Sequence, residues 1–325
     1  MKSSKIVGTG SCLPEKILTN LDLEKIVETS DEWIKTRTGI SERRITDDAV
    51  ATSDLAIKAA KSAIDMSGIK SSDLDLIIVG TTSPDTLFPS TACIIQNLLD
   101  AKKAVAFDVS AACSGFNFAL SIAHNFISSN VYGNALVIGA DTLTKYLNWS
   151  DRNTCVLFGD GAGAVVLTQC EKNSGILANY LHAEGSGGKY LIMPGGGSRN
   201  PNPKSEEERC IKMDGKEVFK FAVRAMEEGI IKVAEMADID LSDIDLVIPH
   251  QANVRIIDHV AKKIGISKEK FFTNLQKYGN TSAASVPIAL DEAYRSGIVK
   301  NDDIIALVGF GAGLTSGANL VKWEV

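Results

Sequence analysis

The sequence repeats part of itself at a fixed distance of 170 residues. The stretch DLDLII at residues 73–78 returns as DIDLVI at residues 243–248. An apolar run that ends on Gly139 matches, at the same offset, a run that ends on Gly309. A period this long is far beyond the roughly 20–50 residues of a solenoid repeat. The chain is therefore predicted to contain two copies of one α/β unit that pack together.

Each copy alternates helical and strand periodicity. A helix-like segment precedes the first apolar run, and another separates the two runs, in both halves. The runs LIIVG and IIALVG are short and continuous, which is typical of strands covered by helices on both faces of a sheet. We divide the chain into an N-terminal half, residues 1–171, and a C-terminal half, residues 172–325. The alternative is a coincidence between two Asp-rich turns, but four elements keep the same offset.

Composition restricts the class of protein without naming its chemistry. The chain has 325 residues, 45% of them hydrophobic, and no apolar run approaches the ~20 residues that cross a membrane. The N-terminal stretch has no apolar segment typical of a secretory signal. A formal net charge of −6 argues against nucleic acid as a partner. The six cysteines form no Cys-x-x-Cys pair, so neither a metal site nor a disulfide framework is expected. We expect a cytoplasmic globular protein.

A cleft is expected where duplicated halves meet, lined by residues that follow matching strands. Cys113 lies between the strand-like run AVAFDV and the helix-like run GFNFALSIAHNFI, among small residues that permit a tight turn. A thiol at a helix N-terminus is expected to have a lowered pKa, which enriches the nucleophilic thiolate. The alternative is a buried structural cysteine. We assign that role to the other five, Cys12, Cys93, Cys155, Cys170 and Cys210.

Two further residues follow the same logic. His250 comes directly after the repeated strand DLVIP and opens into the polar stretch QAN, and Asn280 lies three residues before Ala283, the counterpart of Cys113. Their alternatives are a structural histidine and a plain Gly-Asn turn. Together the three make a Cys-His-Asn set suited to nucleophilic catalysis. Cysteine proteases use the same residue types, so the set alone does not name the reaction.

Six segments resemble, in order, signatures of the beta-ketoacyl-[acyl-carrier-protein] synthase III family of the thiolase-like superfamily. They are TSDEWIKTRTGISERR (29–44), DVSAACSGF (108–116), LFGDGAGAVVL (157–167), PHQANVRI (249–256), GNTSAASVPIAL (279–290) and GFGAGLTSG (309–317). Elongating condensing enzymes have a second histidine, and thiolases a second cysteine, where this chain has Asn280. The resemblance covers essentially the whole length.

The resemblance implies a duplicated, five-layered αβαβα fold of the α/β class, a homodimer, and a decarboxylating condensation with no cofactor and no metal. Cys113 would take the acyl group of an acyl-CoA primer, with backbone N–H groups of Cys113 and of Ala312 or Gly311 holding the oxyanion. Malonyl-acyl carrier protein would then lose carbon dioxide. Both the His250 ring and the Asn280 amide can donate hydrogen bonds to the resulting enolate. Its attack on the acyl-cysteine would give a beta-ketoacyl-carrier protein and start fatty acid synthesis.

The resemblance also implies binding residues. Those matching CoA-binding positions of a substrate tunnel are Trp33, Arg37, Thr38, Arg152, Phe219 and Asn253. Phe88 matches a residue that reaches across the dimer to the partner's acyl pocket. Ser316 stands where a tryptophan is common in the family, so the resemblance does not specify the shape of the acyl pocket or the identity of the acyl primer.

A basic strip is expected beside the site. At helical spacing Arg255 and Lys262 share one face, and Lys263 and Lys220 extend it. Opposite charge would steer an acidic carrier protein to this strip, although any single lysine is equally consistent with a solvated helix face.

Other interpretations stay open. A starter synthase or acyltransferase of quinolone or polyketide biosynthesis would use the same fold. A cysteine thioesterase and a non-catalytic CoA-binding protein are the alternatives from other classes. Residues 184–209, rich in Gly, Pro, Asn and charge, are expected to form a long exposed connection, with a lid near the entrance as the functional alternative.

Overall fold

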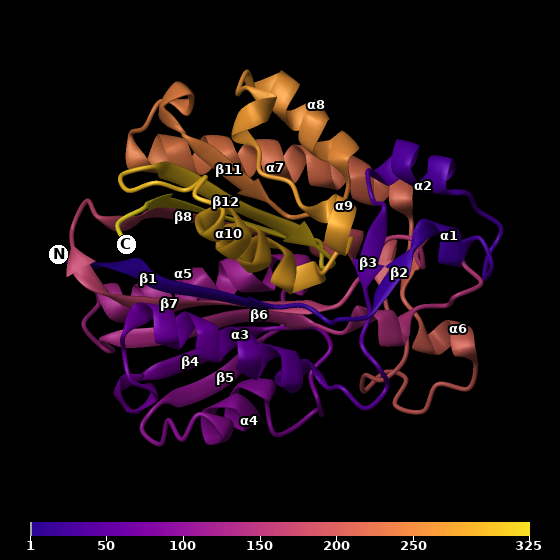
Figure 1. The fold of residues 1–325 in the computed structure, drawn as a ribbon, viewed down its shortest axis with the longest axis horizontal. Helices are drawn as coiled ribbons and strands as arrows, with labels where there is room; N and C mark the ends of the chain where they lie inside the picture. Colours follow the sequence, from indigo (N-terminus) through magenta and orange to yellow (C-terminus); the bar gives the residue numbers. More distant parts are fainter. Residues whose placement is uncertain (1) are drawn as a thin grey trace.

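The structure, a computed structural model, describes residues 2–325 and has five layers in the order α-β-α-β-α (Figure 1). One sheet has the order β1-β7-β6-β4-β5 and the other β11-β12-β13-β8. The first sheet contains β1 (Lys2–Cys12), β4 (Leu76–Gly80), β5 (Val105–Val109), β6 (Asn134–Asp141) and β7 (Gly161–Glu171). The second contains β8 (Gly175–Ala183), β11 (Leu246–Pro249), β12 (Ile304–Gly311) and β13 (Thr315–Lys322). The layered fold implied by the resemblance is thus confirmed.

Three apolar cores hold the layers together. The central layer is α5 (Gly115–Ser128) and α10 (Ser285–Arg295), which pack between the sheets. The outer layers are α3 (Thr52–Ser67) with α4 (Thr91–Leu98) on the first sheet, and α7 (Gly215–Ala237) with α8 (Val254–Ile264) on the second. Because helices cover both faces, every residue of β4 is buried, which explains its continuous apolar sequence.

The structure repeats at the offset seen in the sequence. Strand β11 follows β4, β12 follows β6 and α10 follows α5 at 170 residues. The strand pairing repeats too. In the first half β4 is parallel to β6, and β6 is antiparallel to β7. In the second half β11 is parallel to β12, and β12 is antiparallel to β13. The halves differ at one edge. β5 pairs along its whole length with β4, whereas its counterpart in the second half is a single bridge between Val247 and Phe271.

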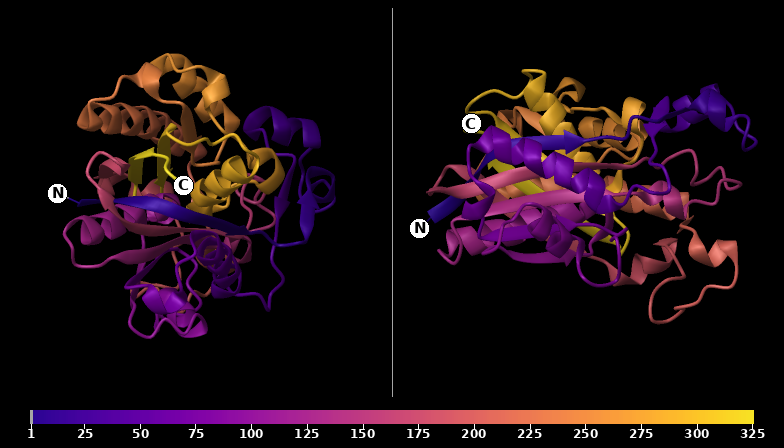
Figure 2. Two further views of the ribbon diagram at one scale, coloured as in Figure 1. Left: turned by 60° about the vertical axis from the view of Figure 1, so that its left-hand side comes forward. Right: turned by 60° about the horizontal axis from the view of Figure 1, so that its bottom comes forward.

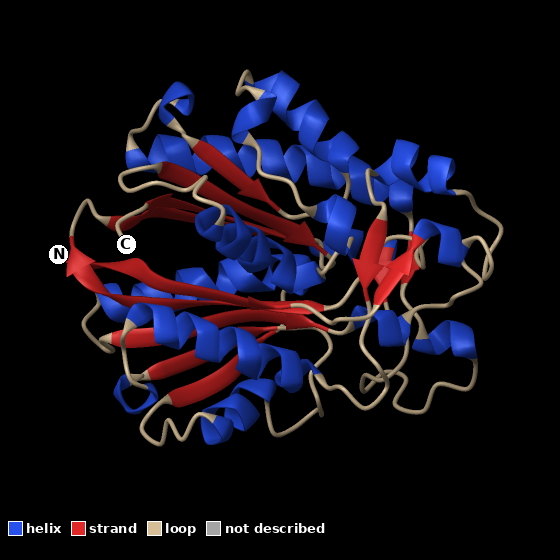
Figure 3. Cartoon of the chain, viewed as in Figure 1, coloured by secondary structure: helices blue, strands red, loops and turns tan. Residues whose placement is uncertain are grey.

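Two excursions leave the layered body at one end, on the right of Figure 1 and of the right-hand view of Figure 2. The first consists of β2 (Ile17–Thr19), α1 (Asn20–Leu23), α2 (Asp31–Thr38) and β3 (Glu42–Arg44). The second, residues 184–213, contains β9 (Leu191–Ile192), α6 (Glu206–Arg209) and β10 (Lys212–Met213). Figure 3 shows that this second excursion is mostly loop, but β9 and β10 pair with each other. The short helix α9 (Leu275–Tyr278) also lies toward this end.

No helix among residues 2–325 combines the length and apolar character needed to cross a membrane.

Candidate active site

The turn that carries Cys113 meets its counterpart from the other half. Short 3-10 turns at residues 112–114 and 282–284 precede α5 and α10, and they contact each other across the central layer. Ala112 and Ser282, 170 residues apart, both have a left-handed backbone, with φ of 46° and 52°. This conformation is uncommon for residues with a side chain. The duplication therefore brings the Cys113 turn against the segment that contains Asn280.

Gly311, the last residue of β12, lies directly against Cys113. A Cβ atom at this glycine would be 2.6 Å from the Cys113 nitrogen and 2.9 Å from its Cβ, closer than such atoms approach. Ala312 lines a cavity together with Cys113. The two backbone segments expected to hold an oxyanion, that of Cys113 and that at the end of β12, are therefore in direct contact.

Cys113, His250 and Asn280 line one cavity of about 140 Å³. Their exposed fractions are 5%, 2% and 6%, so water is largely excluded from the three side chains. The ring of Phe310 packs edge-on against His250, with 5.0 Å between ring centroids. In a site this dry, a hydrogen-bond donor stabilises developing charge more strongly than it does in water.

The backbone orients the Asn280 amide as a donor. Its Oδ1 accepts a hydrogen bond from the Ser282 N–H at 2.9 Å. Its own backbone bonds to the facing segment, donating to the Leu157 carbonyl at 2.8 Å and accepting from the Gly159 N–H at 2.9 Å. Because Oδ1 is engaged, the NH₂ group is the part of the amide left to face the cavity.

His250 is a neutral imidazole whose tautomer depends on one hydroxyl. Burial lowers the pKa of His250 to about 3. Its Nδ1 lies 2.6 Å from Oγ of Ser285, the first residue of α10. When Ser285 donates to Nδ1, the ring proton resides on Nε2, and that N–H becomes a donor.

The expectation of a lowered pKa for Cys113 is wrong for the resting site. Burial raises the pKa of the Cys113 thiol to about 12, and the nearby Asp141 carboxylate acts in the same direction. The Ser282 hydroxyl, which donates to Sγ at 3.4 Å, opposes this shift only in part. Desolvation therefore outweighs the local effect of the helix N-terminus, and the resting group is a thiol.

This gives a pH prediction for alkylation. We expect the rate of iodoacetamide modification of Cys113 to rise about tenfold per pH unit from pH 7 to pH 10 without a plateau, because the thiolate fraction rises that way below a pKa of about 12. Peptide mass spectrometry after timed alkylation measures the rate. A plateau near pH 7 would show that Cys113 is a stable thiolate.

A second cavity, of about 220 Å³, extends from Cys113 and is lined mainly by apolar side chains. They are Leu143, Tyr146, Phe158, Leu191, Ile192, Met193 and Ile211. The last four belong to the excursion at residues 184–213, so this segment walls a cavity as well as connecting elements. Phe88 is not among the residues that line this cavity in its own chain, and it is 84% exposed.

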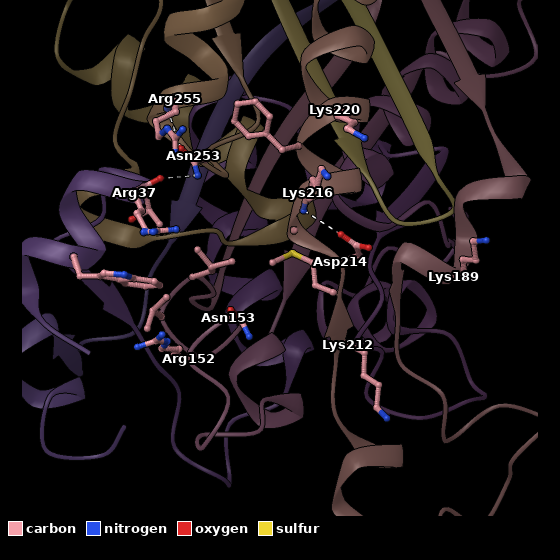
Figure 4. A pocket seen from close by; sticks show the side chains of 17 residues that line it. Arg37, Arg152, Asn153, Lys189, Lys212, Asp214, Lys216, Lys220, Asn253 and Arg255 are labelled. Atoms are coloured by element: carbon pink, nitrogen blue, oxygen red, sulfur yellow. Dashed lines mark hydrogen bonds between the residues drawn. The ribbon is translucent and has the colours of Figure 1, made fainter. Parts of the chain in front are cut away.

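A third cavity, of about 860 Å³, forms an open mouth (Figure 4). All six residues expected to bind CoA line it. Arg37 and Arg152 lie over the Trp33 ring, with their guanidinium carbons 4.8 and 5.2 Å from its centroid. The mouth and the Cys-His-Asn cavity share lining residues, and these mark the passage between them: Leu157, Met213, Gly215, Phe219 and Asn253.

Two of the six have side chains that form hydrogen bonds within their own helix or its cap. The Thr38 hydroxyl donates to the Ile34 carbonyl at 2.7 Å, inside α2. The Asn253 side chain caps α8 by accepting from the Arg255 N–H at 2.9 Å. Their presence in the mouth is therefore also explained by local structure.

The expected basic strip is exposed but partly neutralised. Lys220 pairs with Glu217 at 2.7 Å, and Lys263 pairs with Glu227 at 2.6 Å. Within residues 2–325, Arg255 and Lys262 form no ion pair, which leaves them as the strip's unneutralised cations.

The sequence did not identify Ser285 or Asp141. Buried Asp141, at the end of β6, accepts hydrogen bonds from residues 81–83 through Oδ1 and from the Ala283 N–H through Oδ2. It therefore ties the wall of the apolar cavity to the turn after Asn280. The 170-residue repeat contained a signal for both residues. Asp141 is the counterpart of Gly311, and Ser285 is the counterpart of Gly115.

Comparisons with known proteins point to one family. A family described as 3-oxoacyl-[acyl-carrier-protein (ACP)] synthase III matches residues 107–185, and the C-terminal part of the same enzyme matches residues 234–323. Beta-ketoacyl-[acyl-carrier-protein] synthase III of Caldanaerobacter subterraneus is 58% identical over 322 residues, covering 98% of this chain and 97% of the relative. That of Clostridium novyi is 52% identical over 326 residues, covering 100% of both.

Solved structures extend the likeness to three dimensions. The crystal structure of 3-oxoacyl-[acyl-carrier-protein] synthase III from Aquifex aeolicus has a TM-score of 0.92 and 52% identity, covering 98% of this chain and 100% of that one. The priming beta-ketosynthase from the R1128 polyketide pathway has a TM-score of 0.93 at 33% identity, covering 99% and 96%.

Proposed function

The chain belongs to the beta-ketoacyl-[acyl-carrier-protein] synthase III family, and from this premise we propose how its own residues carry out the initiating condensation of fatty acid biosynthesis. It is a condensing enzyme and an acyltransferase. One observation supports the proposal most directly: a sulfur, an imidazole and a carboxamide from distant parts of the chain line a single buried cavity.

In the first half-reaction Cys113 accepts the acyl group. Its sulfur attacks the thioester carbonyl of acyl-CoA, the N–H groups of Cys113 and of Ala312 or Gly311 hold the oxyanion, and coenzyme A leaves as its thiol with the cysteine's proton. The acyl chain occupies the apolar cavity of about 220 Å³.

In the second half-reaction malonyl-acyl carrier protein loses carbon dioxide. The N–H groups of His250 and Asn280 stabilise the enolate oxygen, which is the charge that develops in this step. The enolate carbon then attacks the acyl-cysteine, and the departing Cys113 thiolate takes a proton from solvent. The thioester and the lost carboxylate supply the leaving group and the carbanion, so we propose that no bound cofactor or metal takes part.

The test is product analysis with acetyl-CoA and malonyl-acyl carrier protein. A beta-ketoacyl-carrier protein, formed with one carbon dioxide per turnover, supports the proposal. Free acetate with no new carbon–carbon bond would identify a thioesterase. Acylation of Cys113 without use of the malonyl group would point to a specialised acyltransferase. A role in polyketide priming is the second candidate, because the R1128 priming enzyme shares the fold at 33% identity.

We also propose that the carrier protein docks on the strip formed by Lys220, Arg255, Lys262 and Lys263. Lys262→Glu is expected to raise KM for malonyl-acyl carrier protein about tenfold while leaving Cys113 acylation by acetyl-CoA unchanged, because Lys262 lies outside the mouth. Steady-state kinetics at low and high salt measure this effect. Lys232→Glu, on the distant end of α7, is the control with the same change in net charge; an equal effect there would refute a local docking surface.

We further propose that the protein is a homodimer formed at the β5 side of the first sheet. Apolar side chains are exposed there, with Leu87 at 83%, Phe88 at 84%, Leu98 at 51% and Val105 at 46%. Such a patch is typical of an interface. Phe88→Asp is expected to shift the mass measured by light scattering from two chains to one, and the exposed Leu21→Asp is the matched control. A wild-type mass of one chain would exclude the dimer.

A further inference from the structure

Three lysines line the mouth on the wall across from Arg37 and Arg152 (Figure 4). Lys189 comes from the 3-10 turn Gly185–Tyr190, Lys212 from β10 and Lys216 from the first turn of α7. None of them belongs to the residues assigned above to CoA or to the carrier protein.

The mouth concentrates positive charge on an otherwise acidic chain. Its lining includes seven cations, Arg37, Arg152, Lys189, Lys212, Lys216, Lys220 and Arg255, and one carboxylate, Asp214. That carboxylate caps α7 by accepting from the N–H groups of Lys216 and Glu217, each at 3.2 Å. Across residues 2–325, only Lys212 and Lys220 among the seven pair with a carboxylate. Most of the like charges therefore face one cavity without compensation, an arrangement that an anionic ligand stabilises.

We propose that Lys189, Lys212 and Lys216 form a phosphate subsite that binds the phosphate groups of the CoA thioester from the wall facing Arg37 and Arg152. The inference rests on the proposed function and deepens it. Ammonium groups act as point charges toward phosphate oxygens, whereas guanidinium groups bind them in a fixed fork. A coenzyme A thioester carries a pyrophosphate and a 3′-phosphate, while the arm of a carrier protein carries one phosphodiester. Cations on two walls match the ligand with more phosphates.

The position of the lysines has a structural consequence. Lys189 and Lys212 lie on the excursion at residues 184–213, whose Leu191 and Ile211 also wall the apolar cavity. Phosphates held between the two walls would link this excursion to the body of the protein. Phosphate binding and the shape of the acyl cavity would then be coupled.

The test compares three acyl donors on the variant K189Q/K212Q/K216Q, which removes the charges and keeps side chains of similar length. Rates of Cys113 acylation are measured with acetyl-CoA, acetyl-dephospho-CoA and acetyl-pantetheine. We expect the apparent affinity for acetyl-CoA to fall about 10- to 100-fold, and the rate with acetyl-pantetheine to stay within about twofold. The matched control is K102Q/K232Q/K268Q, three exposed lysines outside the mouth, with the same loss of charge and no expected effect.

The dephospho donor locates the phosphate. If the triple variant leaves the apparent affinity for acetyl-dephospho-CoA unchanged, the lysines bind the 3′-phosphate. If it lowers that affinity, they bind the pyrophosphate. Either result supports the subsite. An unchanged affinity for acetyl-CoA overturns it, as does an equal loss with acetyl-pantetheine. A larger loss in KM for malonyl-acyl carrier protein than for acetyl-CoA would also overturn it, because the lysines would then serve the carrier. If wild-type Cys113 is acylated by none of the three donors, the proposed function itself fails.

Discussion

Cys113→Ala is expected to gain no mass on incubation with acetyl-CoA, while the wild-type protein gains one acetyl group. The variant removes the only atom proposed to hold the acyl chain, so condensation should fall by about 10⁴- to 10⁶-fold. Intact-mass spectrometry detects the adduct, and a steady-state assay with malonyl-acyl carrier protein gives the rate. Alanine nearly preserves the packing around a residue that is only 5% exposed, so the fold should be retained.

The control is Cys93→Ala, which removes the exposed cysteine of α4. We expect this variant to be acetylated and active like the wild type. An acetyl adduct that persists in Cys113→Ala and disappears in Cys93→Ala would identify the exposed Cys93 as the nucleophile and refute the proposal. Thermal unfolding of each variant separates loss of chemistry from loss of structure.

His250→Ala and Asn280→Ala are each expected to slow decarboxylation of malonyl-acyl carrier protein by about 10²- to 10³-fold, the usual cost of losing one donor to a developing oxyanion. Acylation of Cys113 by acetyl-CoA should continue within about tenfold, since these donors act in the second half-reaction. Release of labelled carbon dioxide measures the first effect, and intact mass measures the second. Between pH 6 and 8 the wild-type rate should show no ionisation of His250, whose pKa is about 3.

Two variants sharpen the assignment. Asn280→Asp keeps the shape of the side chain but replaces a donor with a negative charge, so it should be at least as impaired as Asn280→Ala. Ser285→Ala leaves the imidazole in place and removes the partner of its Nδ1, so it should lose less activity than His250→Ala. Normal decarboxylation by both His250→Ala and Asn280→Ala would falsify the donor roles.

The architecture could be predicted because buried strands leave a direct record in the sequence. A strand such as β4, covered on both faces, must be apolar at every position, and its copy in β11 kept that property at a constant offset. The same offset placed Asn280 near the counterpart of Cys113, so the meeting of the two turns followed from the repeat. The difference between the edges of the two sheets could not be predicted, because the bridge at Phe271 depends on packing and not on a pattern of residues.

The electrostatics of the site could not be predicted from local sequence. The tight turn before α5 indicated a thiol activated by a helix, but the pKa of Cys113 depends on burial by segments far away in the chain. Ser285 lies in a run of small residues that is typical of the start of a helix. No feature of the neighbouring sequence indicates that it contacts His250. Lys189 and Lys212 are far from Arg37 and Arg152 in the sequence, and only the fold of the excursion at residues 184–213 places them in the lining of the same mouth.

The passage between the mouth and the Cys-His-Asn cavity determines the order of events. Phe219 and Leu157 line both spaces, so we expect the arm of each substrate to pass the same side chains on its way to Cys113. Because the mouth joins this cavity through one shared passage, we expect the spent coenzyme to withdraw before the carrier's arm enters. The kinetics should therefore be ping-pong, with parallel double-reciprocal plots, and excess malonyl-carrier protein should inhibit by occupying the unloaded enzyme.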